Sequence, residues 1–336
     1  MEETENIFEH MAPPVLVVTS GAGGGNKSIG ETFSEKMKGI ENTIICIDEF
    51  LPENAVNEDV HRYKFIIEHF RPLLYLAYKT PFVYLRKYVR EKYFGSDLSS
   101  LEEKVKSINP KTVICISHRP AFWLSALKGK KGFDFELCCL ITDFGANIGY
   151  KYLFWSQINT ILSFINMEAL GFSVPAQTKF KKINLISKKG YIEIKEHEGN
   201  KISVLISGGY WGLGDLTTIV EELDGLIPGL NLHIACGKNK EIYQILSNRF
   251  QDNKNTLVYS ELESLTPIMR ECASIITKPG LATLMEAHLS GRKIFLLKGL
   301  PVTEENNARY AIKNLDAEWF TPEAFLNWFR DGKKEK

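Results

Sequence analysis

Short apolar runs alternate with amphipathic stretches along almost the whole chain. In the first half, such runs occupy 14–19 (PVLVVT), 43–48 (TIICID), 112–117 (TVICIS) and 136–142 (ELCCLIT). A run of this length that is apolar on both faces is typical of a strand in a parallel sheet, which helices cover on both sides. The first half therefore predicts an α/β domain in which these four runs are buried strands.

The second half repeats the same alternation. Strands are predicted at 201–207, 230–236, 256–260, 274–278 and 293–298. Between the halves, 172–200 is polar and rich in lysine, and this composition favours an interdomain crossing. We therefore expect an N-terminal domain at 1–172 and a C-terminal domain at 173–336, each built on a Rossmann-like sheet.

A glycine-rich loop, 20–26 (SGAGGGN), follows the first predicted strand. We expect the next helix to begin at Ser28, with Ser28 and Glu31 as a capping box. The loop fails the dinucleotide-binding fingerprint, because Asn26 stands where the third glycine is required, and it misses the phosphate-binding P-loop pattern at the same position. A near-miss P-loop and a turn that only packs the helix on the strand both stay open.

Two further turns in the second half could approach a ligand. The loop 208–215 (GGYWGLGD) leads to a helix that we expect Asp215 to cap, and its glycines allow close approach to the backbone. The segment 274–286 (SIITKPGLATLME) predicts a strand, a tight turn and a helix opening on Thr283, with Thr283 and Glu286 as a capping pair. Such a turn leaves backbone N–H groups at the positive end of a helix, where a phosphate would bind. A plain strand-to-helix turn is the simpler interpretation of each.

The composition describes a globular protein without a strong overall field. The 336 residues include 41 Lys and Arg and 41 Asp and Glu, so no net charge attracts nucleic acid. The six cysteines form no CxxC pair, and we expect reduced, buried thiols of a cytoplasmic protein, without disulfides or a zinc site. We expect neither a signal peptide nor a membrane span, because no run reaches roughly 18 apolar residues.

One stretch departs from this charge balance. Residues 61–94 contain eight Lys and Arg, two Glu and ten Phe and Tyr. Such a segment could insert its aromatic rings at a bilayer surface while its cations meet anionic head groups. It could equally pack as an amphipathic hairpin on its own domain. The first alternative predicts a protein that associates peripherally with the membrane.

The motifs and their order resemble the monogalactosyldiacylglycerol synthase and processive diacylglycerol glucosyltransferase family. The matching stretches extend from about 15 to 307, and the most specific are 234–241 (IACGKNKE) and 275–287 (IITKPGLATLMEA). More distantly, the chain is similar to the lipid-linked N-acetylglucosaminyltransferase of peptidoglycan synthesis. The resemblance implies a GT-B fold, in which two Rossmann-like domains face a cleft. It also implies an inverting hexosyltransferase that moves a sugar from a UDP-sugar to a lipid hydroxyl such as that of diacylglycerol.

The resemblance also implies a set of binding residues. Those that match the family's donor site are Gly208, Gly209, Gly212, Lys278, Pro279, Gly280, Thr283, Glu286, Glu304 and Asn307. Among them, the turn from Lys278 to Thr283 would bind the diphosphate, Glu286 the ribose, and Glu304 and Asn307 the sugar. Gly24, Gly25 and Asn26 would bind the acceptor. We expect no metal or cofactor, because helix dipoles and amide groups can neutralise a departing diphosphate and the sequence has no D-x-D motif.

Three positions depart from the family pattern. Asn26 replaces a histidine that is a candidate for activating the acceptor, Val302-Thr303 replaces a Gly-Gln pair, and a histidine expected soon after Asp143 is missing. Since Asn26 cannot titrate, it could only orient the acceptor. We expect Asp143 to be the base that takes the acceptor proton, with His118 as the second candidate.

Other functions stay open at this point. The same fold could act on a soluble acceptor or on water, which the missing histidine favours, or it could bind nucleotide sugars without turning them over. The P-loop interpretation instead predicts a magnesium-dependent phosphotransferase that uses Lys27.

Overall fold

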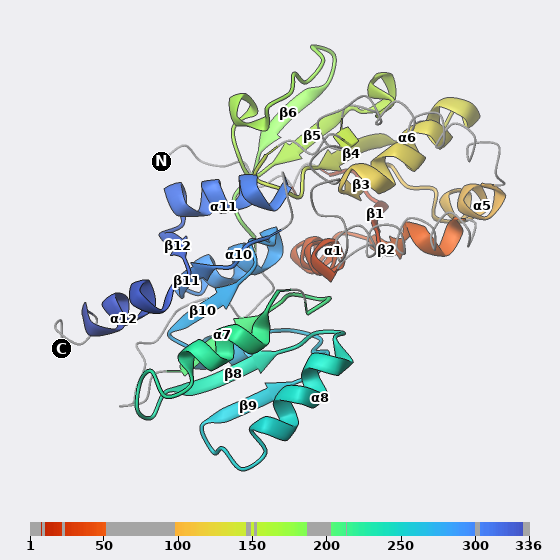
Figure 1. Ribbon diagram of the computed structural model, residues 1–336. Helices are drawn as coiled ribbons and strands as arrows, with labels where there is room; N and C mark the ends of the chain where they lie inside the picture. Colours follow the sequence, from red (N-terminus) through yellow and green to blue (C-terminus); the bar gives the residue numbers. More distant parts are fainter. Residues whose placement is uncertain are drawn as a thin grey trace, which may run out of the picture. The chain divides into compact units, whose positions relative to one another are not determined.

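A computed structural model shows two compact units, each with one parallel sheet and its helices (Figure 1). The structure describes residues 8, 11–21, 24–51, 98–145, 149–150, 153–186, 203–212, 214–299 and 303–331. The first unit comprises Met1–Lys188 with Leu300–Asn306, and the second comprises Lys189–Gly299 with Asn307–Lys336. The predicted architecture of two Rossmann-like sheets is confirmed.

The first sheet has the strand order β2-β1-β3-β4-β5-β6, with every neighbouring pair parallel. Its strands are β1 (Val15–Thr19), β2 (Asn42–Cys46), β3 (Thr112–Ile116), β4 (Glu136–Leu140), β5 (Thr160–Ser163) and β6 (Lys179–Lys182). Its helices include α1 (Gly24–Lys36), α5 (Ser99–Ile108) and α6 (His118–Lys131). The strand order reverses between β1 and β3, and such a switch point is where open α/β sheets bind ligands.

The second sheet has the order β12-β11-β10-β7-β8-β9 and is also parallel throughout. Its strands are β7 (Ser203–Ser207), β8 (Asn231–Ala235), β9 (Thr256–Tyr259), β10 (Ser274–Thr277), β11 (Lys293–Leu296) and β12 (Ala317–Trp319). The helices of this half are α7 (Leu216–Leu223), α8 (Lys240–Arg249), α9 (Thr266–Glu271), α10 (Leu281–Leu289), α11 (Thr303–Asn314) and α12 (Pro322–Asp331). Renumbered within the sheet, this is the Rossmann order 3-2-1-4-5-6, and its switch point lies between β7 and β10.

Aromatic packing attaches α12 to the second sheet. Phe295 on β11 and Phe325 on α12 are fully buried, and their ring centroids are 5.4 Å apart. The ring centroids of Trp328 and Phe295 are 5.6 Å apart, and the two rings pack edge to face. Burial of one phenylalanine side chain stabilises a fold by roughly 1.5–3 kcal/mol, so this cluster fixes α12 against β11.

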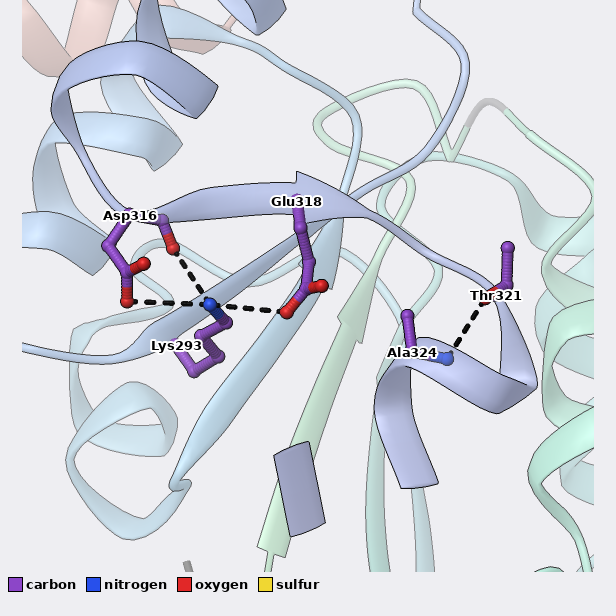
Figure 2. A network of polar contacts seen from close by, with 5 residues as sticks. All are labelled: Lys293, Asp316, Glu318, Thr321 and Ala324. Atoms are coloured by element: carbon purple, nitrogen blue, oxygen red, sulfur yellow. Dashed lines mark hydrogen bonds and ion pairs between the residues drawn. The ribbon is translucent and has the colours of Figure 1, made fainter. Parts of the chain in front are cut away.

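A lysine holds the short edge strand β12 against β11. Figure 2 shows Lys293 Nζ donating to the backbone oxygen of Asp316 at 3.2 Å, with Glu318 Oε1 at 3.1 Å. Asp316 has a φ of +52°, a conformation that Asp and Asn tolerate better than most residues. In the same view, Thr321 Oγ1 accepts from Ala324 N–H at 3.0 Å and so satisfies a free N–H at the start of α12.

Several element boundaries differ from the prediction. Helix α1 begins at Gly24 rather than Ser28, so the glycines form its first turn, and the carbonyl of Ser28 accepts from the Thr32 hydroxyl inside the helix. The helix lies close to β1, since a Cβ on Gly30 would stand 2.2 Å from Thr19 Cγ2. The expected capping box of Ser28 and Glu31 is therefore wrong.

The segment 172–200, expected to be the crossing, contains a strand of the first sheet. β6 pairs with β5, so the first unit continues beyond 172 to Lys188. Its sequence, KFKK, alternates without a buried apolar face, because β6 is an edge strand whose lysines meet solvent.

The predicted burial of the cysteines is confirmed for five of the six. All six thiols are free, five are buried, and Cys46 is half-buried. Burial raises the pKa of the Cys138 thiol to about 12, so this group stays protonated at neutral pH. The basic, aromatic stretch 61–94 lies outside the described residues.

Candidate functional site

Two loops meet at the switch point of the second sheet. The loop after β7 contains Gly208, Gly209 and Gly212, and the turn after β10 contains Lys278, Pro279 and Gly280. Because β7 and β10 are parallel neighbours, both loops leave the same edge of the sheet. The structure therefore brings together most of the residues that the sequence predicted as the donor site.

The Lys278 side chain lies across the backbone of the other loop. Gly209 has a φ of +71°, and a Cβ there would stand 2.6 Å from Lys278 Cε and 3.7 Å from its Nζ. The backbone conformation of residue 209 favours glycine, and any larger residue there would also displace this lysine. The arrangement holds a cation between the carboxyl ends of β7 and β10.

Helix α10 starts directly after this turn and has no side-chain cap. Its N-cap residue is Gly280, with φ −74° and ψ 130°, which has no side chain to cap the N–H groups of the first turn. Thr283 is the third residue of the helix and Glu286 the sixth, so the predicted capping pair is wrong. The positive end of α10 thus lies at the switch point, and its N-cap residue supplies no side-chain acceptor.

Asn307 supports the turn from behind. Its side chain is only 1% exposed, and Nδ2 donates to the Pro279 carbonyl at 3.1 Å. Glu304, one turn earlier on α11, is 7% exposed. The sequence predicted both residues as contacts of the sugar, and the structure shows that Asn307 also bonds to the backbone of the turn predicted to bind the diphosphate.

The glycines after β7 also have a packing cause. A Cβ on Gly212 would stand 2.1 Å from the carbonyl oxygen of Cys236, and one on Gly237 would stand 2.5 Å from that of Gly209. Lys238 N–H donates to the Tyr210 carbonyl at 2.9 Å, and its Nζ lies 4.5 Å from the Tyr210 ring centroid. The loops after β7 and β8 therefore interlock backbone to backbone, which fixes the shape of the loop that borders the switch point.

The switch point of the first sheet carries the predicted acceptor residues. Gly24 and Gly25 open α1, and Asn26 Nδ2 donates to Ser20 Oγ at 3.3 Å. His118 opens α6 after β3, on the other side of the switch point. Between them, Ser117 has φ +91° and ψ 171°, a conformation otherwise confined to glycine. Strain of this kind concentrates at functional sites, where the surrounding fold imposes it.

The two candidate bases lie near one buried tyrosine, Tyr150. The ring centroids of His118 and Tyr150 are 5.2 Å apart. Tyr150 Oη accepts a hydrogen bond from the backbone N–H of Thr142 at 3.1 Å, and Thr142 precedes Asp143 in the chain. Burial, and to a smaller degree the nearby charge of Asp143, raises the pKa of the Tyr150 phenol. Asp143 and His118 thus belong to one cluster at the carboxyl ends of β3 and β4.

Tyr150 and its neighbour Gly149 were not predicted from the sequence. A Cβ on Gly149 would stand 2.2 Å from His118 Cδ2, so this glycine allows the imidazole to lie against the backbone. Tyr150 is one of several aromatic residues in GYKYLFW. Nothing in that run shows which of these rings contacts a candidate base and which are ordinary core residues.

A carboxylate occupies the first amide of the glycine-rich loop. Asp48, in the short 3₁₀ helix Ile47–Phe50 after β2, accepts a hydrogen bond from Gly21 N–H at 2.6 Å. A P-loop uses its backbone amides for nucleotide phosphates, and a negative side chain at this amide opposes that use. The arrangement disfavours the phosphotransferase interpretation.

A pocket of about 640 Å³ opens beside this loop in the first unit. Its walls come from the ends of β1 and β2 and from α1 and α5, and they combine apolar Ile44 and Phe50 with the charged side chains of Lys27, Glu49 and Lys104. The pocket therefore offers a mixed apolar and charged surface next to the predicted acceptor loop.

Two kinds of feature are absent from the described residues. Within that part of the chain, no group of three or more His, Cys, Asp or Glu side chains is placed to hold a metal ion. No described helix is both long enough and apolar enough to span a membrane.

Comparison with known sequences identifies relatives of one kind. No model of a known protein family matches the chain. The processive diacylglycerol beta-glucosyltransferase of Bacillus cytotoxicus is 24% identical over 320 residues, which cover 89% of this chain and 79% of that protein. A protein of the same name from Bacillus cereus (strain B4264) is 24% identical over 314 residues, with the same coverage. The resemblance drawn from the motifs is confirmed.

Solved structures of glycosyltransferases share the fold. MurG of Acinetobacter baumannii gives a TM-score of 0.57 at 14% identity, over 94% of this chain and 90% of that chain. The spinosyn rhamnosyltransferase SpnG gives 0.52 at 12% identity, over 90% and 84%. UGT89C1 of Arabidopsis thaliana, complexed with UDP-L-rhamnose, gives 0.50 at 12% identity, over 91% and 84%. The predicted GT-B fold is confirmed.

Proposed function

We propose that this chain, a glycosyltransferase by its relatives and its fold, transfers a hexose from a UDP-sugar to the hydroxyl of a diacylglycerol-like lipid, with inversion. The observation that carries the proposal is the switch point of the second sheet. There, Lys278, the uncapped start of α10 and the loop after β7 leave one edge of the sheet together.

The donor's diphosphate fits this edge chemically. Backbone N–H groups at the start of α10 and the Lys278 ammonium group would stabilise the negative charge that grows on the diphosphate as it leaves. Glu286, one turn into α10, would accept hydrogen bonds from the ribose hydroxyls. Asn307 would keep the turn in place through the Pro279 carbonyl. On this account the leaving group needs no metal ion.

In the transfer step, the acceptor oxygen bonds to the anomeric carbon as the bond from that carbon to the diphosphate oxygen breaks. The electron pair of the broken bond remains on the diphosphate, and a base takes the acceptor proton. We assign the base to Asp143 first and His118 second, because both lie around Tyr150 at the carboxyl ends of β3 and β4. Asn26 would orient the acceptor, since it cannot accept a proton at neutral pH.

The lipid acceptor is supported by the named relatives and by the stretch 61–94. The relatives carry the name processive diacylglycerol beta-glucosyltransferase. The eight cations and ten aromatic rings of 61–94 suit the surface of an anionic membrane, so we expect peripheral association there. A soluble acceptor or water is the second candidate, and the observation that favours it is Asn26 in place of the family's histidine.

The direct test is a transfer assay with purified protein. Radiolabelled UDP-glucose, UDP-galactose and UDP-N-acetylglucosamine are each incubated with vesicles of phosphatidylglycerol that contain diacylglycerol, and labelled lipid and free sugar are separated. We expect labelled glycolipid with one donor, and none from Asp143→Asn if Asp143 is the base. Free sugar with no glycolipid would support the second candidate. If UDP raises the melting temperature but no product forms with any donor, the protein binds nucleotide sugars without transferring them.

A further inference from the structure

A buried ion pair connects the two loops at the switch point of the first sheet. Asp48 Oδ1 lies 2.9 Å from Arg119 Nη2, and the two side chains are 11% and 10% exposed. Arg119 is the second residue of α6, directly after His118. The other carboxylate oxygen of Asp48 accepts from Gly21 N–H at 2.6 Å. One side chain therefore contacts the loop after β1 and the start of α6 at the same time.

The geometry around Gly21 leaves little freedom. A Cβ at this position would stand 2.9 Å from Asp48 Oδ2, so glycine is required for the carboxylate to reach the backbone amide. The predicted acceptor residues Gly24, Gly25 and Asn26 follow three to five residues later, in the first turn of α1. The hydrogen bond to Gly21 thus fixes the chain just before the residues that would hold the acceptor.

The start of α6 is constrained in the same way. Arg119 is only 9% exposed as a residue, although a guanidinium group normally prefers solvent. Its neighbour His118 lies against Gly149 and Tyr150, and Ser117 before it has the strained φ of +91°. Through Arg119, Asp48 is connected to the element that carries one candidate base and the strained turn.

Stability alone gives a weak reason for such a pair. Removing two charges from water is costly, and apolar residues of similar size often serve a fold equally well. The Asp48 carboxylate, however, contacts both loops, because Oδ2 accepts from Gly21 N–H and Oδ1 forms an ion pair with Arg119, which an apolar side chain could not do. The buried pair at the switch point therefore favours a geometric role.

We propose that Asp48 and Arg119 are positioning residues for glycosyl transfer, and that the pair keeps the acceptor loop in register with the base cluster around Tyr150. The inference rests on the proposed function. Neither residue is assigned a contact with the substrate; Asp48 acts through Gly21 and Arg119 acts through α6.

Three variants separate this role from simple stability. Asp48→Asn retains an oxygen for Gly21 N–H but loses the charge that faces Arg119. Arg119→Met leaves the Asp48 carboxylate buried without its cation. The double variant D48N/R119M has no buried charge and keeps the bond to Gly21, but it has no connection to α6. Lys131→Met is the matched control, because it breaks another ion pair of α6, with Glu102 at 2.7 Å, at the far end of the helix.

Both single variants should melt at lower temperature than the wild type, and the double variant should regain most of the loss. In transfer assays, the double variant should nevertheless keep at least a tenfold lower kcat/KM for the lipid acceptor, with the KM for the donor unchanged. Lys131→Met should leave both kinetic constants unchanged. If the double variant recovers acceptor kcat/KM together with its melting temperature, the pair is only structural and the inference is overturned.

A second readout does not depend on activity. Hydrogen exchange measured by mass spectrometry should be faster in the double variant for peptides covering 15–36 and 112–131, and unchanged in Lys131→Met outside α5 and the end of α6. Faster exchange at both segments in a protein that transfers no sugar would support the connection and reject the proposed function. Unchanged exchange at either segment would reject the connection, whatever the activity.

Discussion

The strained turn at Ser117 leads to a prediction that runs against the usual effect of glycine. Ser117 has φ +91° and ψ 171°, and its side chain is 3% exposed with no hydrogen-bond partner for Oγ among the described residues. A non-glycine residue in this region costs on the order of 1–3 kcal/mol. Ser117→Gly should remove that cost. Glycine has more conformational freedom in the unfolded chain, and this lowers the stability of the folded protein by about 0.5–1 kcal/mol.

The net effect is a gain of about 0–2.5 kcal/mol in the free energy of unfolding, beyond any gain from deleting the buried hydroxyl. Ser117→Ala is the matched control, because it also deletes the hydroxyl but keeps the Cβ that causes the strain. The difference between the two variants in urea-induced unfolding therefore isolates the backbone strain.

The stabilised variant should also transfer sugar more slowly. Strain at a functional turn persists because the fold imposes it, and its relief commonly reduces activity. We expect Ser117→Gly to be more stable than Ser117→Ala and less active than the wild type. If Ser117→Gly proves no more stable than Ser117→Ala, the turn is not strained in solution, and it gives no reason to place a functional site at α6.

Four further predictions concern the second unit. Gly212→Ala should lower the free energy of unfolding by about 2–4 kcal/mol, because the φ of this residue is +60° and the new Cβ would stand 2.1 Å from the Cys236 carbonyl oxygen. Gly214→Ala is the control: its φ is +107°, but the nearest atom to its Cβ, Leu297 Cδ1, would be 4.0 Å away. It should lower the free energy of unfolding by less in the same urea titration. Lys293→Met should cost about 1 kcal/mol by loss of its two carboxylate partners, and an unchanged urea midpoint would show that β12 is held by packing alone. Burial lowers the pKa of His233 in the folded protein below its value of about 6.5 in the unfolded chain. The neutral imidazole therefore contributes stability above pH 6.5, and this contribution is lost as the pH falls through the lower pKa of the folded protein. The urea midpoint of the wild type should drop more between pH 7.5 and 5 than that of His233→Gln. Lys278→Met should reduce kcat/KM for the donor by about 10²-fold. If the variant has wild-type kinetics, the lysine does not contribute to diphosphate binding.

The sheets could be predicted from the sequence because parallel strands buried on both faces are continuous apolar runs. The predicted strand at 112–117 corresponds to β3 (Thr112–Ile116), and 230–236 corresponds to β8 (Asn231–Ala235). Three strands were not predicted: β6 and β12 are edge strands, which need no apolar face, and β5, although buried, has only four residues. The order of strands, and with it the switch points, is set by contacts far apart in sequence.

Helix starts were predicted less well, and for a physical reason. A Ser/Thr-x-x-Glu pattern indicates a capping box only if the serine or threonine is the N-cap residue. At Ser28 and Thr283 the helix begins earlier, because the chain enters it directly from the turn that follows a strand. Asp215 was predicted correctly, since its carboxylate accepts from Thr218 N–H at 3.1 Å.

Most of the residues predicted to bind the donor lie at one switch point, but the contacts that support them could not be predicted. The role of Asn307 behind Pro279 and the passage of Lys278 over Gly209 depend on spatial neighbours that no local pattern encodes. The same holds for Asp48 and Arg119, which are 71 positions apart and lie in unremarkable sequence (119 − 48 = 71).

The central claim is that the second unit binds the diphosphate of a nucleotide sugar at the switch point between β7 and β10. A crystal structure of the protein soaked with uridine diphosphate, without added metal, tests it most directly. The account predicts diphosphate oxygens at the N–H groups that open α10, with the Lys278 ammonium group within hydrogen-bond distance. Uridine diphosphate bound elsewhere, or an empty turn at a saturating concentration that shifts the melting temperature, would contradict it.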